Sequence, residues 1–193
     1  LLALWVMPTI VAMSLTACGG DSKTTSTTDP VATLPTVSSP TEVVTAGDKQ
    51  VVINVIDTSS ISSSSSKSSK STSSTHANWN LYLWNDTTCS ALDSTDSSID
   101  VGSWDKVDNM ATGEDTYGPY WTLPVTSDSG CVNFILRNGT DKLISSDMKV
   151  DFSAFPDRTV TVVPGKSTVY DTRAAAFAAA FGVAQAKAHL VSG

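Results

Sequence analysis

Basic residues are scarce in this chain of 193 residues, which has 12 Lys and Arg against 19 Asp and Glu and a net charge of −7. Nucleic-acid binding requires clustered Lys and Arg that neutralise phosphates, and the sequence contains no basic run. The same shortage argues against electrostatic adsorption to an anionic membrane. The composition therefore excludes nucleic acid as the expected partner.

Histidine is rarer still, with His76 beside a Ser-rich run and His189 near the last residue, so a Ser–His–Asp arrangement is not indicated. Phosphate-binding Gly-rich loops are absent, and two His and three Cys are too widely spread for a zinc site. The acidic residues from Asp86 to Asp115 offer oxygen ligands for calcium, but they lack EF-hand spacing and favour a solvated loop. The sequence predicts no catalytic residues, no cofactor and no metal.

Long apolar runs are missing except in residues 1–17, which are uncharged and end in Leu15-Thr16-Ala17-Cys18 before an abrupt change to polar sequence. This pattern resembles the lipobox of bacterial lipoproteins, in which cleavage precedes a lipidated Cys. The segment is too short for a confident transmembrane helix, and an apolar helix of the domain is the alternative. We expect a signal peptide that starts a few residues before Leu1, lipidation of Cys18, and an exported lipoprotein at the outer membrane or cell surface.

Export has a consequence for the cysteines that remain once Cys18 carries lipid. An exported chain matures in an oxidising compartment, so we expect Cys89 and Cys131 to form a disulfide.

Two segments have compositions that cannot bury a core. Residues 18–41 are rich in Ser, Thr and Pro and predict a flexible tether. Residues 58–75 are dominated by Ser and predict a disordered loop. Because the single strand before this loop cannot stand alone, we interpret 58–75 as an insertion within one domain spanning 42–171, rather than as an interdomain linker.

Short β-branched or alternating segments recur through this domain, with turn signals at Gly130 and at Asn138-Gly139. Several short strands without an intervening helix predict an all-β fold, an antiparallel immunoglobulin-like β-sandwich. The predicted strands are 50–56, 79–84, 120–125, 131–137, 148–152, 159–163 and 168–170.

The pattern changes in residues 172–193, which are rich in Ala. Asp171-Thr172 is a helix-capping signal, and Phe177 and Phe181 share one face at i and i+4. We expect a helix from Arg173 to about His189 that leads to a further domain beyond Gly193.

The strand 79–84 combines aromatic and aliphatic side chains on opposite faces. Alternation places Leu81 and Leu83 on one face and Tyr82 and Trp84 on the other. With the leucines in the core, the two aromatic rings face solvent roughly 7 Å apart and offer a platform for the flat apolar face of a sugar. The alternative is that both rings are covered by a second sheet or by the acidic loop.

Two other tryptophans of the domain, Trp121 and Trp79, are predicted to pack in the core. Trp121 alternates with Leu123 and Val125 and is predicted to be core, and Trp79 is on the inward face of its strand. Trp104 is not part of an alternating pattern, so the sequence allows two interpretations of it, packing within a loop or contact with a ligand.

Several motifs, in this order and spacing, resemble carbohydrate-binding module family 41, the N-terminal α-glucan-binding module of bacterial pullulanases. The resemblance covers roughly residues 42–190. The segments that carry it are 80–85, Trp104-Asp105, 117–121, 139–147, 157–160, 169–171 and the helix 176–184.

In that family, two aromatic residues on one strand stack on glucose rings, and a Lys and an Asp bind sugar hydroxyls. The resemblance assigns these roles to Tyr82, Trp84, Lys142 and Asp147. Two non-coplanar rings would suit a curved α-1,4-linked chain.

A third stacking Trp often precedes the Lys in the family. It is missing here, where the sequence reads Asn138-Gly139-Thr140. Trp104 is the candidate substitute.

The resemblance implies a non-catalytic module that binds starch, glycogen or pullulan, beside a downstream debranching domain that hydrolyses α-1,6 linkages. Such a glycoside hydrolase family 13 domain carries its carboxylates on a (β/α)₈ barrel of about 250 residues, which does not fit in this chain. The alternative function is a non-catalytic surface lipoprotein whose immunoglobulin-like domain binds protein.

Overall fold

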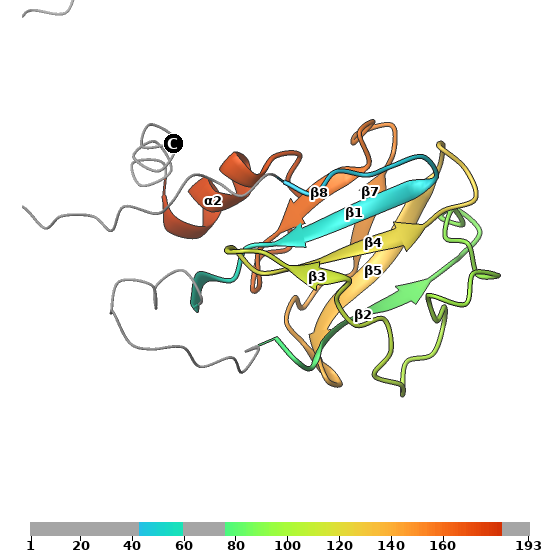
Figure 1. The fold of residues 1–193 in the computed structure, drawn as a ribbon, viewed down its shortest axis with the longest axis horizontal. Coiled ribbons are helices and arrows are strands. Elements are labelled where there is room, and N and C mark those ends of the chain that lie inside the picture. The colour runs from blue at the N-terminus through green and yellow to red at the C-terminus, as the bar shows by residue number, and fades with distance from the viewer. Residues whose placement is uncertain (1–42, 60–75, 183–193) are drawn as a thin grey trace, which may run out of the picture. The chain divides into compact units, whose positions relative to one another are not determined.

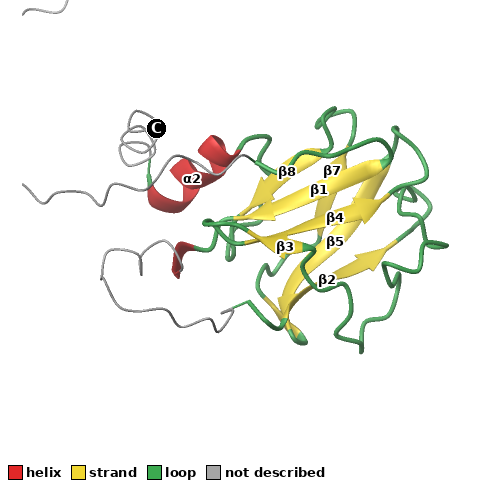
Figure 2. Ribbon diagram, in the orientation of Figure 1, coloured by secondary structure: helices red, strands yellow, loops and turns green. Residues whose placement is uncertain are grey.

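The structure is a computed structural model that describes residues 43–59 and 76–182 (Figure 1). Two β-sheets pack face to face (Figure 2). One sheet has the strand order β3-β4-β1-β8, and the other has the order β2-β5-β6 with β7 also paired to β5. The predicted all-β sandwich is confirmed. The strands are β1 (Gln50–Val55), β2 (Trp79–Trp84), β3 (Gly113–Glu114), β4 (Pro119–Pro124), β5 (Cys131–Asn138), β6 (Asp141–Lys142), β7 (Met148–Asp151) and β8 (Thr159–Val162).

Strand β1 occupies an inner position in its sheet, which explains why four of its six residues are β-branched. It pairs antiparallel with β4 and parallel with β8, with Val52 opposite Thr159. The first sheet is therefore mixed, whereas the sequence predicted antiparallel pairing throughout. Both faces of β1 are covered, so its side chains from Val51 onward are buried, as strands covered on two sides require. Both partners of β1 follow the Ser-rich segment in the chain.

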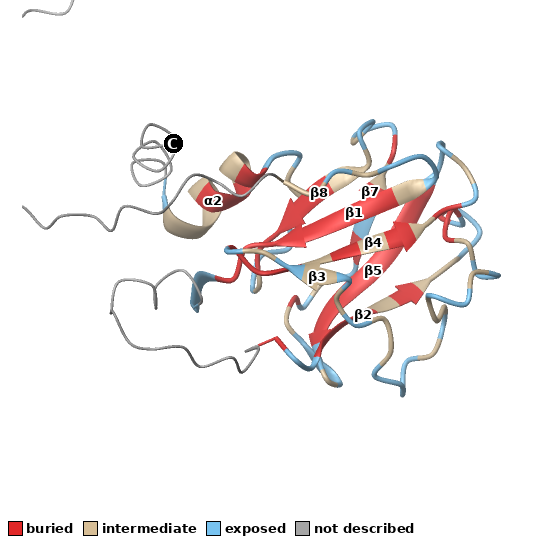
Figure 3. Ribbon diagram, viewed as in Figure 1, coloured by how far each residue is buried: buried red, intermediate tan, exposed pale blue. Residues whose placement is uncertain are grey.

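The main core lies between the inner faces of the two sheets (Figure 3). Leu81 and Leu83 of β2 are fully buried there, as the alternation predicted. Trp121 is also buried, and its indole N–H donates to the carbonyl of Asn109 at 2.8 Å, so its predicted core position is confirmed. Trp79 belongs to the same core and meets the ring of His76 edge-on at 4.5 Å between centroids.

Helix α2 (Arg173–Phe181) follows the strands. Its start agrees with the predicted cap, because the Thr172 side chain accepts a hydrogen bond from the Ala175 N–H. The described helix ends at Phe181 and is capped by Gly182, which has a φ of 94°. The remainder of the predicted helix, to about His189, lies outside the described residues.

A second apolar cluster joins α2 to the sandwich. Phe177 packs with Ile56, Tyr117 and Val163. Arg173, at the start of the helix, forms an ion pair with Asp115. The first two turns of α2 are thereby held against the sandwich by both apolar and charged contacts.

Smaller features differ from the sequence prediction. Residues 168–170 form an isolated bridge, Tyr170 opposite Thr161, rather than a strand. The two-residue strands β3 and β6 were not predicted, because two residues carry no alternation pattern. Gly139 has a φ of 60° between β5 and β6, which agrees with the predicted turn.

The predicted disulfide is present and joins Cys89, in the loop after β2, to Cys131 at the start of β5. The predicted signal peptide, Cys18, the tether and most of the Ser-rich run lie outside the described residues. Within 43–59 and 76–182, none of the helices has the length and apolar character needed to cross a bilayer.

Candidate functional site

Tyr82 and Trp84 lie on the outer face of β2, opposite the buried leucines. Their ring centroids are 5.3 Å apart and their planes differ by 23°. The spacing is shorter than the roughly 7 Å between alternate strand positions. The two planes are close to parallel, so this pair does not provide the non-coplanar surfaces that were expected.

Trp104 provides a ring whose plane is steeply inclined to that of Tyr82. It comes from the long loop between β2 and β3, and its ring meets Tyr82 at 77° with 4.7 Å between centroids. Trp104 is 39% exposed, and Tyr82 and Trp84 are partly buried. The acidic loop therefore borders the platform and adds a ring to it. Trp84, Tyr82 and Trp104 form a contiguous surface with a corner, which we call the aromatic corner.

Lys142 and Asp147 lie beside the aromatic corner. Lys142 is on β6, and its Nζ is 5.4 Å from the centre of the Trp104 ring. Asp147 precedes β7, with Oδ1 3.8 Å from Lys142 Nζ. The side chains of Lys142 and Asp147 are 38% and 69% exposed, so both are open to solvent. Of the predicted ligand-binding residues, the structure brings all five into one region.

Sequence reasoning missed Arg137, which lies on β5 beneath this region. It is 1% exposed, and its guanidinium is 5.7 Å from the Tyr82 ring centre and 5.1 Å from that of Trp104. Burial lowers the pKa of Arg137, although an arginine stays charged at any physiological pH. The alternation of β5 placed Arg137 on the outer face, but a strand pattern does not show that a distant loop covers it.

The acidic loop between β2 and β4 uses its carboxylates to form turns. Asp86 accepts hydrogen bonds from the N–H and hydroxyl of Thr88, and Asp93 does the same with Thr95. These bonds lower the pKa of both carboxyl groups, with the Thr88 N–H as the main cause at Asp86 and the Thr95 hydroxyl at Asp93. In the described part of the chain, no group of three or more His, Cys, Asp or Glu is arranged to hold a metal ion.

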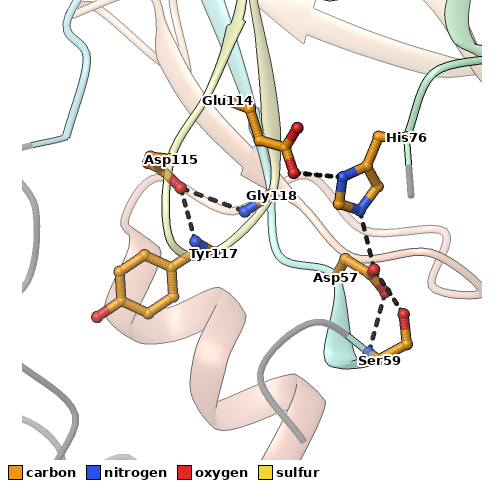
Figure 4. A network of polar contacts seen from close by, with 7 residues as sticks. All are labelled: Asp57, Ser59, His76, Glu114, Asp115, Tyr117 and Gly118. Atoms are coloured by element: carbon orange, nitrogen blue, oxygen red, sulfur yellow. Dashed lines mark hydrogen bonds and ion pairs between the residues drawn. The ribbon is translucent and has the colours of Figure 1, made fainter. Parts of the chain in front are cut away.

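A buried polar cluster, separate from the aromatic corner, lies where β1 ends and β2 begins (Figure 4). The buried ring of His76 has Nε2 2.9 Å from Asp57 Oδ2 and Nδ1 2.6 Å from Glu114 Oε1. Ser59 donates to Asp57 through its N–H and its hydroxyl. This network ties together three segments that no strand pairing joins directly.

The aromatic corner can bury flat apolar surfaces, and its border offers a cationic donor and an anionic acceptor. Ring faces bind C–H-rich surfaces, while Lys142 and Asp147 suit hydroxyl groups. The fold and this surface define the class, a β-sandwich module with a candidate binding face.

Comparison with known proteins identifies the family. Residues 70–171 match the model of the bacterial pullanase-associated domain. The match covers more than half of the chain, so the chain belongs to this family. It confirms the resemblance drawn from the aromatic and Lys–Asp motifs.

Relatives of high identity are pullulanases. The chain is 47% identical over 178 residues to the pullulanase of Klebsiella pneumoniae, covering 92% of this chain and 15% of the relative. It is 49% identical over 163 residues to that of Klebsiella aerogenes, covering 84% of this chain and 14% of the relative. The chain thus spans about one seventh of the length of these relatives.

Solved structures show the same relationship. PulA from Klebsiella oxytoca matches with a TM-score of 0.64 and 48% identity, covering 77% of this chain and 13% of that one. A Klebsiella pneumoniae pullulanase complexed with maltotriose matches with a TM-score of 0.63 and 49% identity over the same shares.

Proposed function

We propose that this chain is the non-catalytic α-glucan-binding portion of a pullulanase-type debranching enzyme. The observation that carries the proposal is the aromatic corner of Trp84, Tyr82 and Trp104, bordered by Lys142 and Asp147. Membership of the pullanase-associated family and the maltotriose complex of a relative support an α-glucan as ligand.

The physical basis is the two-sided chemistry of glucose. Each ring presents C–H groups on its faces, and burying them on an aromatic side chain contributes about 25 cal/mol per Å². Hydroxyls surround the ring, where Lys142 donates and Asp147 accepts charge-assisted hydrogen bonds. The 77° angle between the ring planes of Tyr82 and Trp104 suits a chain that bends, as an α-1,4-linked glucan does.

Binding at such an open surface is modest for one site, because association costs several kcal/mol of lost freedom. A polymer offers the same sugar repeatedly, and repeated engagement raises the effective affinity. The module therefore suits retention on starch, glycogen or pullulan rather than tight capture of one sugar.

The proposal extends to the larger protein through the relatives. Because they are pullulanases and this chain spans only a small share of them, we place hydrolysis of α-1,6 linkages in another part of the same polypeptide. We further propose that Cys18 carries lipid and anchors the protein at the outer membrane or cell surface. Labelling with a radioactive fatty acid tests this, and Cys18→Ser should abolish incorporation.

Native-gel retardation tests the binding function. The whole chain should migrate more slowly in gels containing pullulan or glycogen, and at its normal rate in a gel containing a cellulose derivative. Trp84→Ala should remove the retardation while the fold persists. Lys166→Ala, which changes an exposed residue in the turn after β8, is the control and should be retarded like the wild type.

Each outcome is decisive. Retardation by α-glucans alone, lost in Trp84→Ala, supports the proposal. A folded, disulfide-bonded chain that no α-glucan retards contradicts it and favours a protein-binding lipoprotein.

A further inference from the structure

Arg137 occupies a position that links the two sides of the aromatic corner. On β5 it lies between Asn80 of β2 and Lys142 of β6, each directly opposite it in the strand register. Directly opposed residues of antiparallel strands point to the same face of the sheet. Arg137 therefore belongs to the outer face that carries Tyr82, yet it is almost completely buried.

Its guanidinium makes three hydrogen bonds, one within the sheet and two to the loop. Nε donates to Asn80 Oδ1 at 2.9 Å on the sheet. Nη1 donates to the carbonyl of Trp104 at 2.7 Å, and Nη2 donates to the carbonyl of Lys106 at 2.6 Å. The planar fork of an arginine suits two carbonyls of one loop, and a lysine ammonium cannot reproduce that geometry.

The loop that receives these bonds is fixed at its two ends by hydrogen bonds to β2, from the Gly102 N–H to the Leu83 carbonyl and from Asn109 Nδ2 to the Leu81 carbonyl. Residues 103–107 belong to no helix or strand, and Trp104 and Lys106 are exposed. Lys106 also pairs with Asp100 at 2.9 Å, but that contact lies within the loop itself. Arg137 is thus a direct polar connection from the sheet to the main chain of Trp104.

The same cation orients the ring as well as the backbone. Arg137 and Lys142 are neighbours on one face of the sheet, and both approach the Trp104 ring, at 5.1 and 5.4 Å from its centre. Cation–π attraction at these distances holds the indole against the sheet. With these contacts in place Trp104 is still 39% exposed, so part of its surface is open to a ligand.

We propose that Arg137 is a positioning residue for α-glucan binding: it fixes the Trp104 loop so that the indole stands against Tyr82 and forms the second wall of the aromatic corner. This inference rests on the proposed function. In this proposal Trp104, although it comes from a different part of the chain, makes the third sugar contact. Arg137 holds Trp104 in place.

Titration calorimetry with maltoheptaose, a linear α-1,4-glucan of seven glucose units, tests the inference on the whole chain. Trp104→Ala keeps the main-chain carbonyls that Arg137 binds, and it should weaken affinity about tenfold, a change of about 1.4 kcal/mol. Arg137→Lys should weaken it to a similar extent. The double variant should be no weaker than Trp104→Ala, because Arg137 acts through Trp104.

A second readout separates positioning from general stability. Acrylamide quenching of tryptophan emission should increase in Arg137→Lys, because a released Trp104 becomes more accessible. In a Trp104→Phe background the same Arg137 change should leave quenching unaltered. Lys166→Ala, an exposed lysine outside this region, should match the wild type in both measurements. If Arg137→Lys fails to fold, Arg137→Met, which removes the buried charge, takes its place.

The outcomes distinguish this inference from the function on which it rests. Wild-type binding that Trp84→Ala abolishes but Trp104→Ala leaves unchanged overturns the inference alone, whether or not the Arg137 variants fold. Additive losses in the double variant also overturn it. If the wild-type chain binds no α-glucan, both the proposed function and the inference on Arg137 are contradicted.

Discussion

Asp57 and His76 meet at 2.9 Å although the Ser-rich segment separates them in the chain. Both side chains are buried, and the second ring nitrogen of His76 contacts Glu114. Asp57 and His76, which lie on either side of residues 60–75 in the sequence, are therefore joined directly by their side chains.

Replacing His76 by Ala should lower the free energy of unfolding by about 2–3 kcal/mol, because it leaves the buried Asp57 carboxylate without one of its partners. Urea denaturation measures the change. Lys166→Ala should stay within about 0.5 kcal/mol of the wild type, as exposed substitutions do. Equal stability of His76→Ala and Lys166→Ala would show that the contact contributes nothing.

Lys142→Met should reduce affinity for maltotriose about tenfold, because one charge-assisted hydrogen bond to a sugar hydroxyl is lost. The fold should be unaffected, since an exposed pair separated by 3.8 Å contributes little stability. Calorimetric titration gives the affinity and thermal unfolding gives the stability. A stable variant with wild-type affinity would remove Lys142 from the site.

Removing the disulfide through Cys89→Ala and Cys131→Ala should lower the free energy of unfolding by about 2–4 kcal/mol. The sequence separation of 42 residues is long, and the chain-entropy model gives about 4 kcal/mol for a loop of this length. The urea midpoint of the double variant, compared with that of the exposed Ser90→Ala, measures the effect. Coinciding midpoints would contradict the prediction.

Asp86 should titrate below the ordinary value of about 3.9, because the N–H of Thr88 and further donors stabilise its ionised form. A carboxyl whose pKa is depressed in the folded state contributes stability at pH values above its unfolded pKa. That contribution is lost as the pH falls through the folded pKa. We therefore expect the turn at residues 86–89 to be intact at neutral pH and to loosen only below about pH 4.

Carboxyl ¹³C NMR titration of Asp86 measures this directly, and Asp86→Asn should abolish the acid dependence of amide exchange at Thr88 and Cys89. An ordinary pKa at Asp86 would be inconsistent with these hydrogen bonds forming in solution.

The fold was predictable wherever period-two alternation extends over a whole strand. The alternation of β2 placed Leu81 and Leu83 inside and Tyr82 and Trp84 outside, as observed. Parallel pairing of β1 with β8 was not predictable, because a buried central strand has the same β-branched composition whichever direction its neighbour runs.

Tertiary contacts decided the parts of the candidate site that the sequence left open. Trp104 has no periodic neighbours, and its contact with Tyr82 depends on how a long loop returns to the sheet. The pattern of β5 places Arg137 outside, but only the folded loop shows that it is buried. A local signal was available for the acidic loop, where Asp-x-Ser or Asp-x-Thr recurs at Asp86, Asp93 and Asp96 and favours Asx turns.

The pairing of β1 with β8 sets an order of events during synthesis. β8 follows β1 by about 100 residues, so at roughly 5–20 residues per second a ribosome completes β8 between about 5 and 20 seconds after β1. Throughout that interval one hydrogen-bonding edge of β1 is without its native partner. Completion of the first sheet is therefore a late step in the biogenesis of this domain.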